Sequence, residues 1–183
     1  VLLALNVAVF LLQGAVGGRL LVAGAKVNAE IAAGQWYRLF TPMFLHASVS
    51  HLAVNAFSLY STGPSVESWF GRARFTSLYV ISGICGNMLS YLCTPTPSVG
   101  ASGAIFGLVG ATAVVLARHR RILGPRSRNS LNSLAYIMLV NFGMGMSPGS
   151  RIDNFGHLGG LLGGMVFAYL AGPRLVPVRA ENG

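Results

Sequence analysis

Residues 99–117 read VGASGAIFGLVGATAVVLA, and this stretch indicates the fold class more clearly than any other. It contains no charged side chain, and it repeats a small residue every four positions at Gly103, Gly107 and Ala111. A face of small residues lets two helix backbones approach closely in lipid. The stretch ends a longer uncharged run, 75–117, which is more than enough to cross a bilayer. We therefore interpret it as a membrane-spanning helix with a packing face.

The composition of the whole chain agrees with this interpretation. Of 183 residues, 53% are hydrophobic and 9% are charged, against about 25% charged in a typical soluble domain. This balance excludes a disordered chain, which combines low hydrophobicity with high charge. The net charge of +9 has the sign of a nucleic-acid binder, but the chain lacks the polar surface on which such proteins carry their charge. We predict an all-α, polytopic membrane protein that binds no nucleic acid.

The uncharged stretches predict six spanning helices, because each span needs about 20 largely apolar residues. The prolines of Thr94-Pro95-Thr96-Pro97 divide the run 75–117 into two spans. The six predicted spans are 1–17, 44–63, 75–93, 101–117, 130–146 and 154–172.

An even number of spans places both ends of the chain on one side of the membrane. Nine of the 13 cations then lie on that side: Arg72, Arg74, Arg118, Arg120, Arg121, Arg126, Arg128, Arg174 and Arg179. The positive-inside rule assigns this side, with its arginine-rich loop 118–128, to the cytosol or its equivalent.

The segment 18–43 is long for a membrane loop. Its stretch Gln35-Trp36-Tyr37-Arg38-Leu39-Phe40 combines aromatic and cationic side chains, which is typical of a segment anchored at the membrane interface. The sequence begins at Val1 and is apolar from its first residue. We therefore expect the natural chain to begin further upstream and to carry any targeting segment there.

The polar residues inside the predicted spans carry the functional information, because polar groups are costly in hydrocarbon. The second, fourth and sixth spans all run inwards from the non-cytosolic side, and His51, Ser102 and His157 each lie early in one of them. These three side chains are therefore expected at a similar depth. Asn55 lies one helical turn after His51 and on the same face.

Glycine spacing predicts which of these helices touch. The sixth span carries Gly156, Gly160 and Gly164, which match the small-residue face of the fourth span. Close packing of the two spans would bring the Ser102 hydroxyl within hydrogen-bond reach of the His157 imidazole, as a nucleophile and its base require. Asp153 lies at the loop edge, so we expect a Ser–His dyad without a carboxylate partner.

Each element also has a simpler interpretation. Ser102 could bond a carbonyl of its own helix, and His157 could join two helices. His51 and Asn55 could form a buried pair or line a pore. A channel or transporter is therefore an alternative function. A metal site fits poorly because His46 and His51 lack a ligand spacing of the HExxH type. His119, in the arginine-rich loop, is expected to be an ordinary surface residue.

The motifs taken together resemble the rhomboid family of intramembrane serine proteases over essentially the whole chain. The residues that carry the resemblance are Arg38-Leu39-Phe40-Thr41, His46 with His51 and Asn55, Glu67 with Gly71, Gly100-Ala101-Ser102-Gly103-Ala104-Ile105-Phe106-Gly107 and Gly156-His157-Leu158-Gly159-Gly160. The resemblance implies a single rhomboid domain over 1–183 with a six-helix core and a water-filled site open to the non-cytosolic side.

The resemblance also implies roles for individual residues. Ser102 would be the nucleophile and His157 the general base and acid, while His51, Asn55 and the Ser102 backbone N–H would form the oxyanion hole. The supporting residues would be Gly100, Gly103, Phe106, His46, Arg38 and Glu67. The fifth span and the loop 147–153 would gate lateral entry of substrates. The substrates would be transmembrane proteins within the lipid bilayer, and no cofactor or metal would be needed.

Two positions depart from the family pattern. Tyr37 stands where the family often has Trp, and Phe106 stands where it often has a Tyr stacked on the catalytic histidine. Neither change touches the dyad, so we expect an active enzyme; a non-catalytic rhomboid-like protein that binds client helices is the alternative. Several stretches, among them 99–110 and 152–164, are most similar to plastid rhomboid-like proteins. This likeness implies a multi-pass protein of the plastid inner envelope, with a bacterial-type plasma membrane as the alternative.

Overall fold

A computed structural model describes residues 1–147 and 150–175. Its elements, in chain order, are α1 (Leu2–Ala15), α2 (Arg19–Gly24), α3 (Asn28–Ala32), η1 (Trp36–Leu39), η2 (Thr41–Phe44), α4 (Val49–Cys93), α5 (Ser102–Arg118), α6 (Arg120–Leu123), α7 (Pro125–Gly145) and α8 (Asn154–Ala171). Helices dominate the described ranges, and the extended pairing there is a single bridge between Lys26 and Ser98. The all-α fold class is confirmed.

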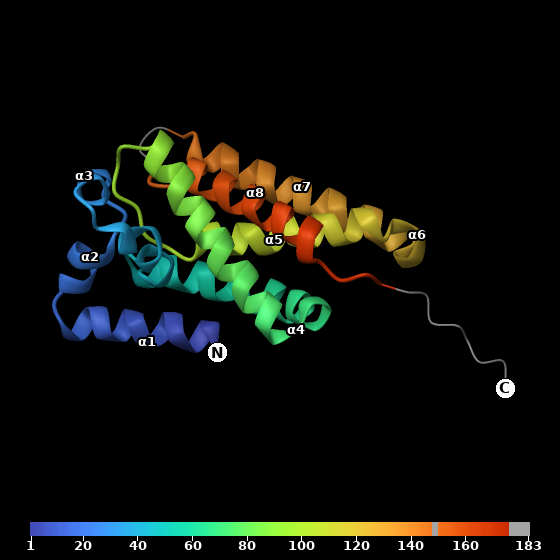
Figure 1. Cartoon of the computed structure of the whole chain (residues 1–183), viewed down its shortest axis with the longest axis horizontal. Helices are drawn as coiled ribbons and strands as arrows, with labels where there is room; N and C mark the ends of the chain where they lie inside the picture. Colours follow the sequence, from blue (N-terminus) through green and yellow to red (C-terminus); the bar gives the residue numbers. More distant parts are fainter. Residues whose placement is uncertain (148–149, 176–183) are drawn as a thin grey trace.

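Helix α4 reverses direction at Gly71, whose φ of 72° and ψ of 162° are not helical. A positive φ is readily adopted only by glycine. Gly71, which the rhomboid resemblance pairs with Glu67, is therefore also the hinge of a helical hairpin. Figure 1 shows the two arms of α4, teal before the reversal and green after it. The arms correspond to the predicted spans 44–63 and 75–93.

The other predicted spans correspond to α1, α5, α7 and α8, with shifted ends. The first arm of α4 starts at Val49 because Thr41–Phe44, with Pro42, forms a 3-10 turn. The arginine-rich segment 118–128 is not an open loop. It contains α6 and the first turn of α7, since Gly124 (φ 66°) ends one helix and Pro125 begins the next.

By length and hydropathy, one helix of the described residues is able to cross a bilayer, namely α4 taken as a whole. The count of six spans therefore stays a prediction. Large apolar side chains are exposed along several helices, among them Phe57, Tyr60, Leu139 and Leu170. A soluble monomer rarely exposes so much apolar surface.

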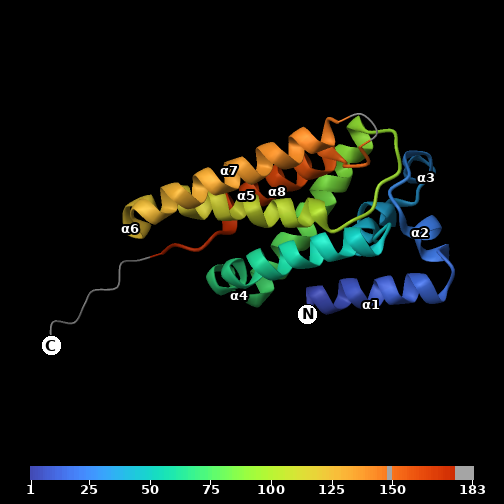
Figure 2. The same cartoon turned by 180° about the vertical axis from the view of Figure 1, so that it is seen from behind.

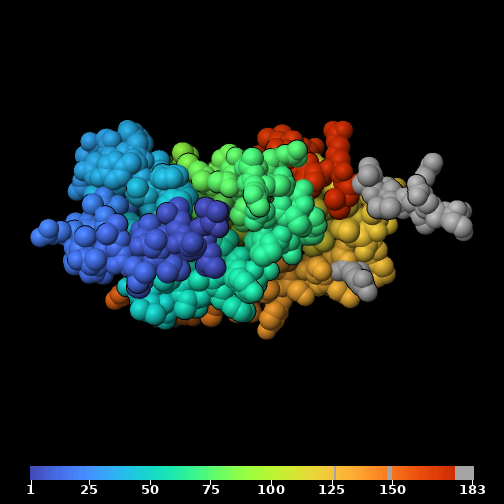
Figure 3. Space-filling model, turned by 90° about the horizontal axis from the view of Figure 1, so that it is seen from below, coloured from blue at the N-terminus to red at the C-terminus, as the bar shows by residue number. Residues whose placement is uncertain are grey.

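Helix α5 occupies the centre of the bundle and packs against α8 and both arms of α4. Figure 2 shows this arrangement from behind, with α7 on the outer side of α5 and α8. Helix α1 lies at the edge along α4, where Figure 3 shows it in dark blue against the teal and green atoms. The amino-terminal ends of α5 and α8 lie at the same end of the bundle, next to the segment that links α1 to α4 (Figure 1).

Candidate active site

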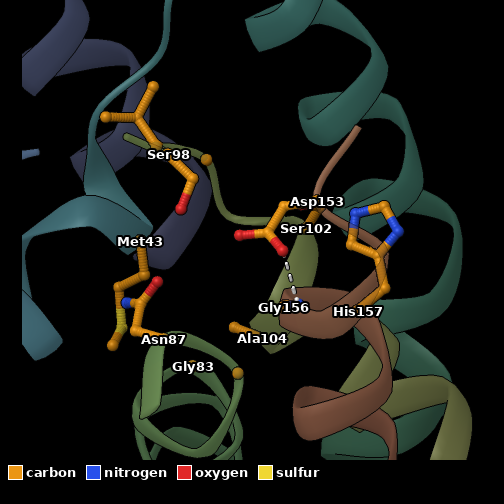
Figure 4. Close-up of a pocket in the computed structure, with 13 residues that line it drawn as sticks. Met43, Gly83, Asn87, Ser98, Ser102, Ala104, Asp153, Gly156 and His157 are labelled. Atoms are coloured by element: carbon orange, nitrogen blue, oxygen red, sulfur yellow. Dashed lines mark hydrogen bonds between the residues drawn. The ribbon is translucent and has the colours of Figure 1, made fainter. Parts of the chain in front are cut away.

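A pocket lies where the amino-terminal ends of α5 and α8 meet the second arm of α4. It encloses about 310 Å³ of empty space, including the solvent at its mouth. Its chemically active lining residues are Asn87, Ser98, Ser102, Asp153 and His157. Figure 4 shows these side chains, with Asp153 between the segment that carries Ser98 and the start of α8. The pocket therefore holds both members of the predicted dyad.

Ser102 is the first residue of α5, and Gly100 determines how the chain approaches it. Gly100 has a φ of 132°, and its N–H donates to the Pro42 carbonyl at 2.9 Å. A Cβ placed on Gly100 would lie 2.8 Å from His51 Cε1 and Nε2, and 3.7 Å from Ser102 Oγ. The His51 ring and the Ser102 hydroxyl therefore flank one point, where only glycine leaves room.

The first turn of α5 also presents backbone donors. The first N–H groups of a helix have no partner within it, and here they belong to Ser102 and the residues that follow it. An oxyanion that forms beside the Ser102 hydroxyl would therefore meet backbone N–H groups and the positive end of the helix dipole.

His157 lies in the first turn of α8 and is 7% exposed. Phe106 of α5 stacks on its ring, with centroids 4.3 Å apart and planes 13° from parallel, and Phe142 of α7 meets the ring edge-on at 6.5 Å. Within the described part of the chain, His157 Nδ1 is buried without a hydrogen-bond partner, and no bond joins the ring to Ser102. Two aromatic rings thus fix the plane of the imidazole, while its Nδ1 makes no hydrogen bond among the described residues.

The backbone contact predicted between the fourth and sixth spans is present between α5 and α8. A Cβ on Gly160 would overlap the Gly103 carbonyl oxygen, and a Cβ on Gly164 would overlap that of Gly107. The second arm of α4 joins the contact, because a Cβ on Gly86 would lie 2.6 Å from the Gly156 carbonyl oxygen. These close approaches surround Ser102 and His157 and set the spacing between their helices.

The structure places Asn55 apart from the Ser102 pocket. Its Nδ2 donates to the His51 carbonyl at 2.9 Å, and its side chain lines a second small cavity with His46 and Ala101. His46 is 1% exposed and meets the His51 ring edge-on at 5.2 Å. The His51 ring thus lies across the Gly100 position from the Ser102 hydroxyl, while Asn55 is bonded within its own helix.

The two remaining supporting residues lie away from the pocket. Arg38 is 5% exposed and donates to the Val22 and Ala25 carbonyls at 3.0 and 2.8 Å, so it ties the first loop together. Glu67 lies near the Gly71 reversal, where its carboxylate is 3.8 Å from the exposed Arg72.

Asp153 has more contacts than its place at the loop edge suggested. It caps α8 by accepting from the Gly156 N–H at 2.8 Å, and it also accepts from the hydroxyl of Ser90 and, at 3.4 Å, from that of Thr94. The sequence signal for the cap is an aspartate three residues before the bonded N–H. The hydroxyl partners come from the last turn of α4 and from Thr94, which caps it, and they have no local signal.

The expectation that His119 is a surface residue was wrong. His119 is 7% exposed, its Nδ1 bonds the Val115 carbonyl at 3.0 Å, and its Nε2 accepts from the Leu175 N–H at 3.1 Å. The chain after α8 returns to cover this ring, which a reading of the loop alone does not reveal.

Comparison with known proteins agrees with this architecture. The Rhomboid domain model matches residues 33–174, and the chain therefore belongs to the rhomboid family. Over 175 residues it is 41% identical to the Rhomboid protease GluP of Bacillus subtilis, which covers 93% of this chain and 34% of that protein. It is 37% identical to RHOMBOID-like protein 9, chloroplastic, of Arabidopsis thaliana over 155 residues, or 85% of this chain and 36% of the relative.

A shorter relative is matched over most of its length. The Putative rhomboid protease YdcA of Bacillus subtilis is 40% identical over 146 residues, which is 78% of this chain and 71% of that protein. The chain thus spans about a third of the first two relatives and most of the third. Membership of the rhomboid family points to an integral membrane protein, and the likeness to a chloroplast protein is compatible with a plastid location.

Proposed function

We propose that this protein is an intramembrane serine endopeptidase that cleaves transmembrane-helix substrates through a Ser102–His157 dyad. The observation that carries the proposal is that Ser102 and His157, on different helices, line one pocket at the amino-terminal end of α5. Relatives named as rhomboid proteases share about 40% of its residues.

The chemistry is acyl transfer. His157 takes the proton of the Ser102 hydroxyl as Oγ attacks the scissile carbonyl, and it returns that proton to the leaving amine. The Ser102 N–H and the His51 ring stabilise the oxyanion. Water then attacks the acyl-enzyme, His157 again takes and returns the proton, and the carboxylic acid product leaves. Asn55 contributes to the oxyanion only after its amide leaves the His51 carbonyl.

The substrate preference follows from backbone chemistry. Peptide bonds within a helix are hydrogen-bonded and shielded, so a cleavable span needs residues that weaken the helix near the cut and small residues at it. The positive-inside assignment places the opening of the proposed site on the non-cytosolic side. We propose a plastid inner envelope membrane as the location, with a bacterial-type plasma membrane as the alternative.

The test is cleavage of a single-span substrate in proteoliposomes, together with labelling by a fluorophosphonate. Wild-type protein should cleave and label, whereas Ser102→Ala should do neither. His157→Ala should lose labelling, while the matched controls Ser77→Ala and His119→Ala should keep it. Cleavage that survives Ser102→Ala would overturn the mechanism. Binding of client spans without any cleavage by wild-type protein would favour the non-catalytic alternative.

A further inference from the structure

Lys26 is a fully buried lysine, at 0% exposure, in the segment between α2 and α3. Lysine is almost never fully buried unless its charge is paired or bonded. Its Nζ donates to the carbonyls of Thr94 at 2.7 Å, Thr96 at 2.9 Å and Ser90 at 3.4 Å. An ammonium has three N–H donors, and all three are used here. The acceptors lie at the carboxyl end of α4, where the helix dipole favours a cation.

The backbone of Lys26 holds a second segment. Its N–H donates to the Ser98 carbonyl at 3.0 Å, and its carbonyl accepts from the Ser98 N–H at 3.1 Å. Ser98 lines the pocket and lies four residues before Ser102. Lys26 therefore fixes the segment that delivers the nucleophile to the end of α5.

Asp153 is an opposite charge that acts on this ammonium, and the two residues share hydrogen-bond partners. The Ser90 carbonyl accepts from Lys26 while its hydroxyl donates to Asp153, and Thr94 bridges the pair in the same way. Burial lowers the pKa of Lys26, and the negative charge of Asp153 opposes that shift. Asp153 in turn holds the Gly156 N–H, one residue before His157.

We infer that Lys26 is a positioning residue for the proposed reaction, which with Asp153 sets the register between Ser102 and His157. This inference rests on the proposed function. One end of the network fixes the segment before Ser102, and the other fixes the first turn of α8. The second arm of α4 joins them through Ser90 and Thr94. Misplacement of reacting groups by about 1 Å can lower a rate about a hundredfold, so the network should act on turnover.

The experiment compares Lys26→Met, Asp153→Asn and the double variant with the wild-type protein in proteoliposomes. Arg19→Met, an exposed cation from the same region, is the matched control. For each we would measure kcat and KM on a single-span substrate, the fluorophosphonate labelling rate, and the unfolding temperature. Lys26→Met should lower kcat and the labelling rate about tenfold or more at temperatures far below its unfolding transition, with KM within about twofold.

Charge compensation supplies a second readout. Asp153→Asn keeps an oxygen for the Gly156 N–H, so this variant should fold, and it should also lower kcat. The double variant should be no slower than Lys26→Met, because the two opposite charges are removed together and the effects of coupled residues are not additive. Arg19→Met should stay within about twofold of wild type.

Several results would overturn the inference. A Lys26→Met protein with a lower unfolding temperature but wild-type kcat would make Lys26 a structural anchor only. If Lys26→Met does not fold, the double variant Ser90→Ala/Thr94→Val tests the inference instead. It removes both hydroxyl bridges to Asp153 and leaves the carbonyls that bind Lys26. Unchanged kcat there would end the proposal. If kcat is unchanged in these variants while wild-type cleavage depends on Ser102, this inference fails and the proposed function stands. If the wild-type protein shows no Ser102-dependent cleavage, the proposed function fails as well.

Discussion

The two halves of the bundle are held together by opposite means. Helices α5 and α8 meet backbone to backbone, at glycines where an added methyl group would overlap a carbonyl oxygen. Helix α1 and the segment that follows it are instead attached by polar side chains that bond carbonyls. Gln13 bonds both the N–H and the carbonyl of His46. Arg38 bonds carbonyls within the first loop, and Lys26 bonds the distant Thr94 carbonyl.

This contrast determines which kind of substitution should destabilise each half. The glycine positions of the α5–α8 contact have no side chain to lose, so they are sensitive to added volume. The α1 half depends on donors, so it is sensitive to their removal, which leaves buried carbonyls unsatisfied. The proposed dyad lies in the first half, while the positioning network links that half to the second.

The largest effect is expected from adding volume at the glycine contact. Gly160→Val would force its side chain into the Gly103 carbonyl, and the helices can relieve this only by separating. We expect the free energy of unfolding to fall by about 4 kcal/mol or more, measured by thermal unfolding in detergent. Gly14→Val, at an exposed position of α1 with nothing within 4 Å, is the control and should change little. Equal stability of the two variants would contradict the contrast between the halves.

The next effect is expected from removing a donor in the α1 half. Arg38→Met keeps the apolar stem and deletes the donors to the Val22 and Ala25 carbonyls. We expect a loss of about 3 kcal/mol, since bonds from charged groups are the stronger ones. Arg72→Met removes an arginine whose side chain is 96% exposed and should leave the unfolding temperature nearly unchanged. A similar loss in both variants would mean that charge, rather than the carbonyl bonds, matters.

A smaller loss is expected at the attachment of α1 itself. Gln13→Leu removes both bonds to the His46 backbone, at 2.9 and 3.1 Å, and should cost about 2 kcal/mol. Asn6→Leu removes one bond between helices, 3.3 Å to the Tyr79 hydroxyl, together with a bond to the Leu2 carbonyl of its own helix, and should cost less. Unfolding temperatures measured in one detergent give the order, and the reverse order would show that α1 is attached mainly through Tyr79.

The contact between α5 and α8 could be predicted from the sequence because the pattern that defines it is local. Glycines four residues apart define a face without knowledge of the partner, and the predicted contact between Gly103, Gly107, Gly160 and Gly164 is observed. Counting the loops placed the starts of those helices at one end, where Ser102 and His157 line a common pocket.

The polar half could not be predicted in the same way, because a carbonyl acceptor leaves no mark on the sequence. Lys26 could be identified as a loop cation, but its acceptors Ser90, Thr94 and Thr96 lie more than 60 residues further along the chain. Asp153 looked like a loop residue for the same reason. His119 was misjudged because Leu175, after the last helix, covers it.

The smallest effect is expected at Phe106, the side chain through which α5 contacts the His157 ring. The stack at 4.3 Å needs an aromatic face and no hydroxyl. Phe106→Tyr should therefore keep kcat within about threefold of wild type, whereas Phe106→Leu, which keeps an apolar side chain but no ring, should lower it by about tenfold. Fluorophosphonate labelling rates provide the measurement. If Phe106→Leu were labelled as fast as Phe106→Tyr, the stack would not fix the imidazole. The backbone contact of α5 with α8 would then orient His157 without it.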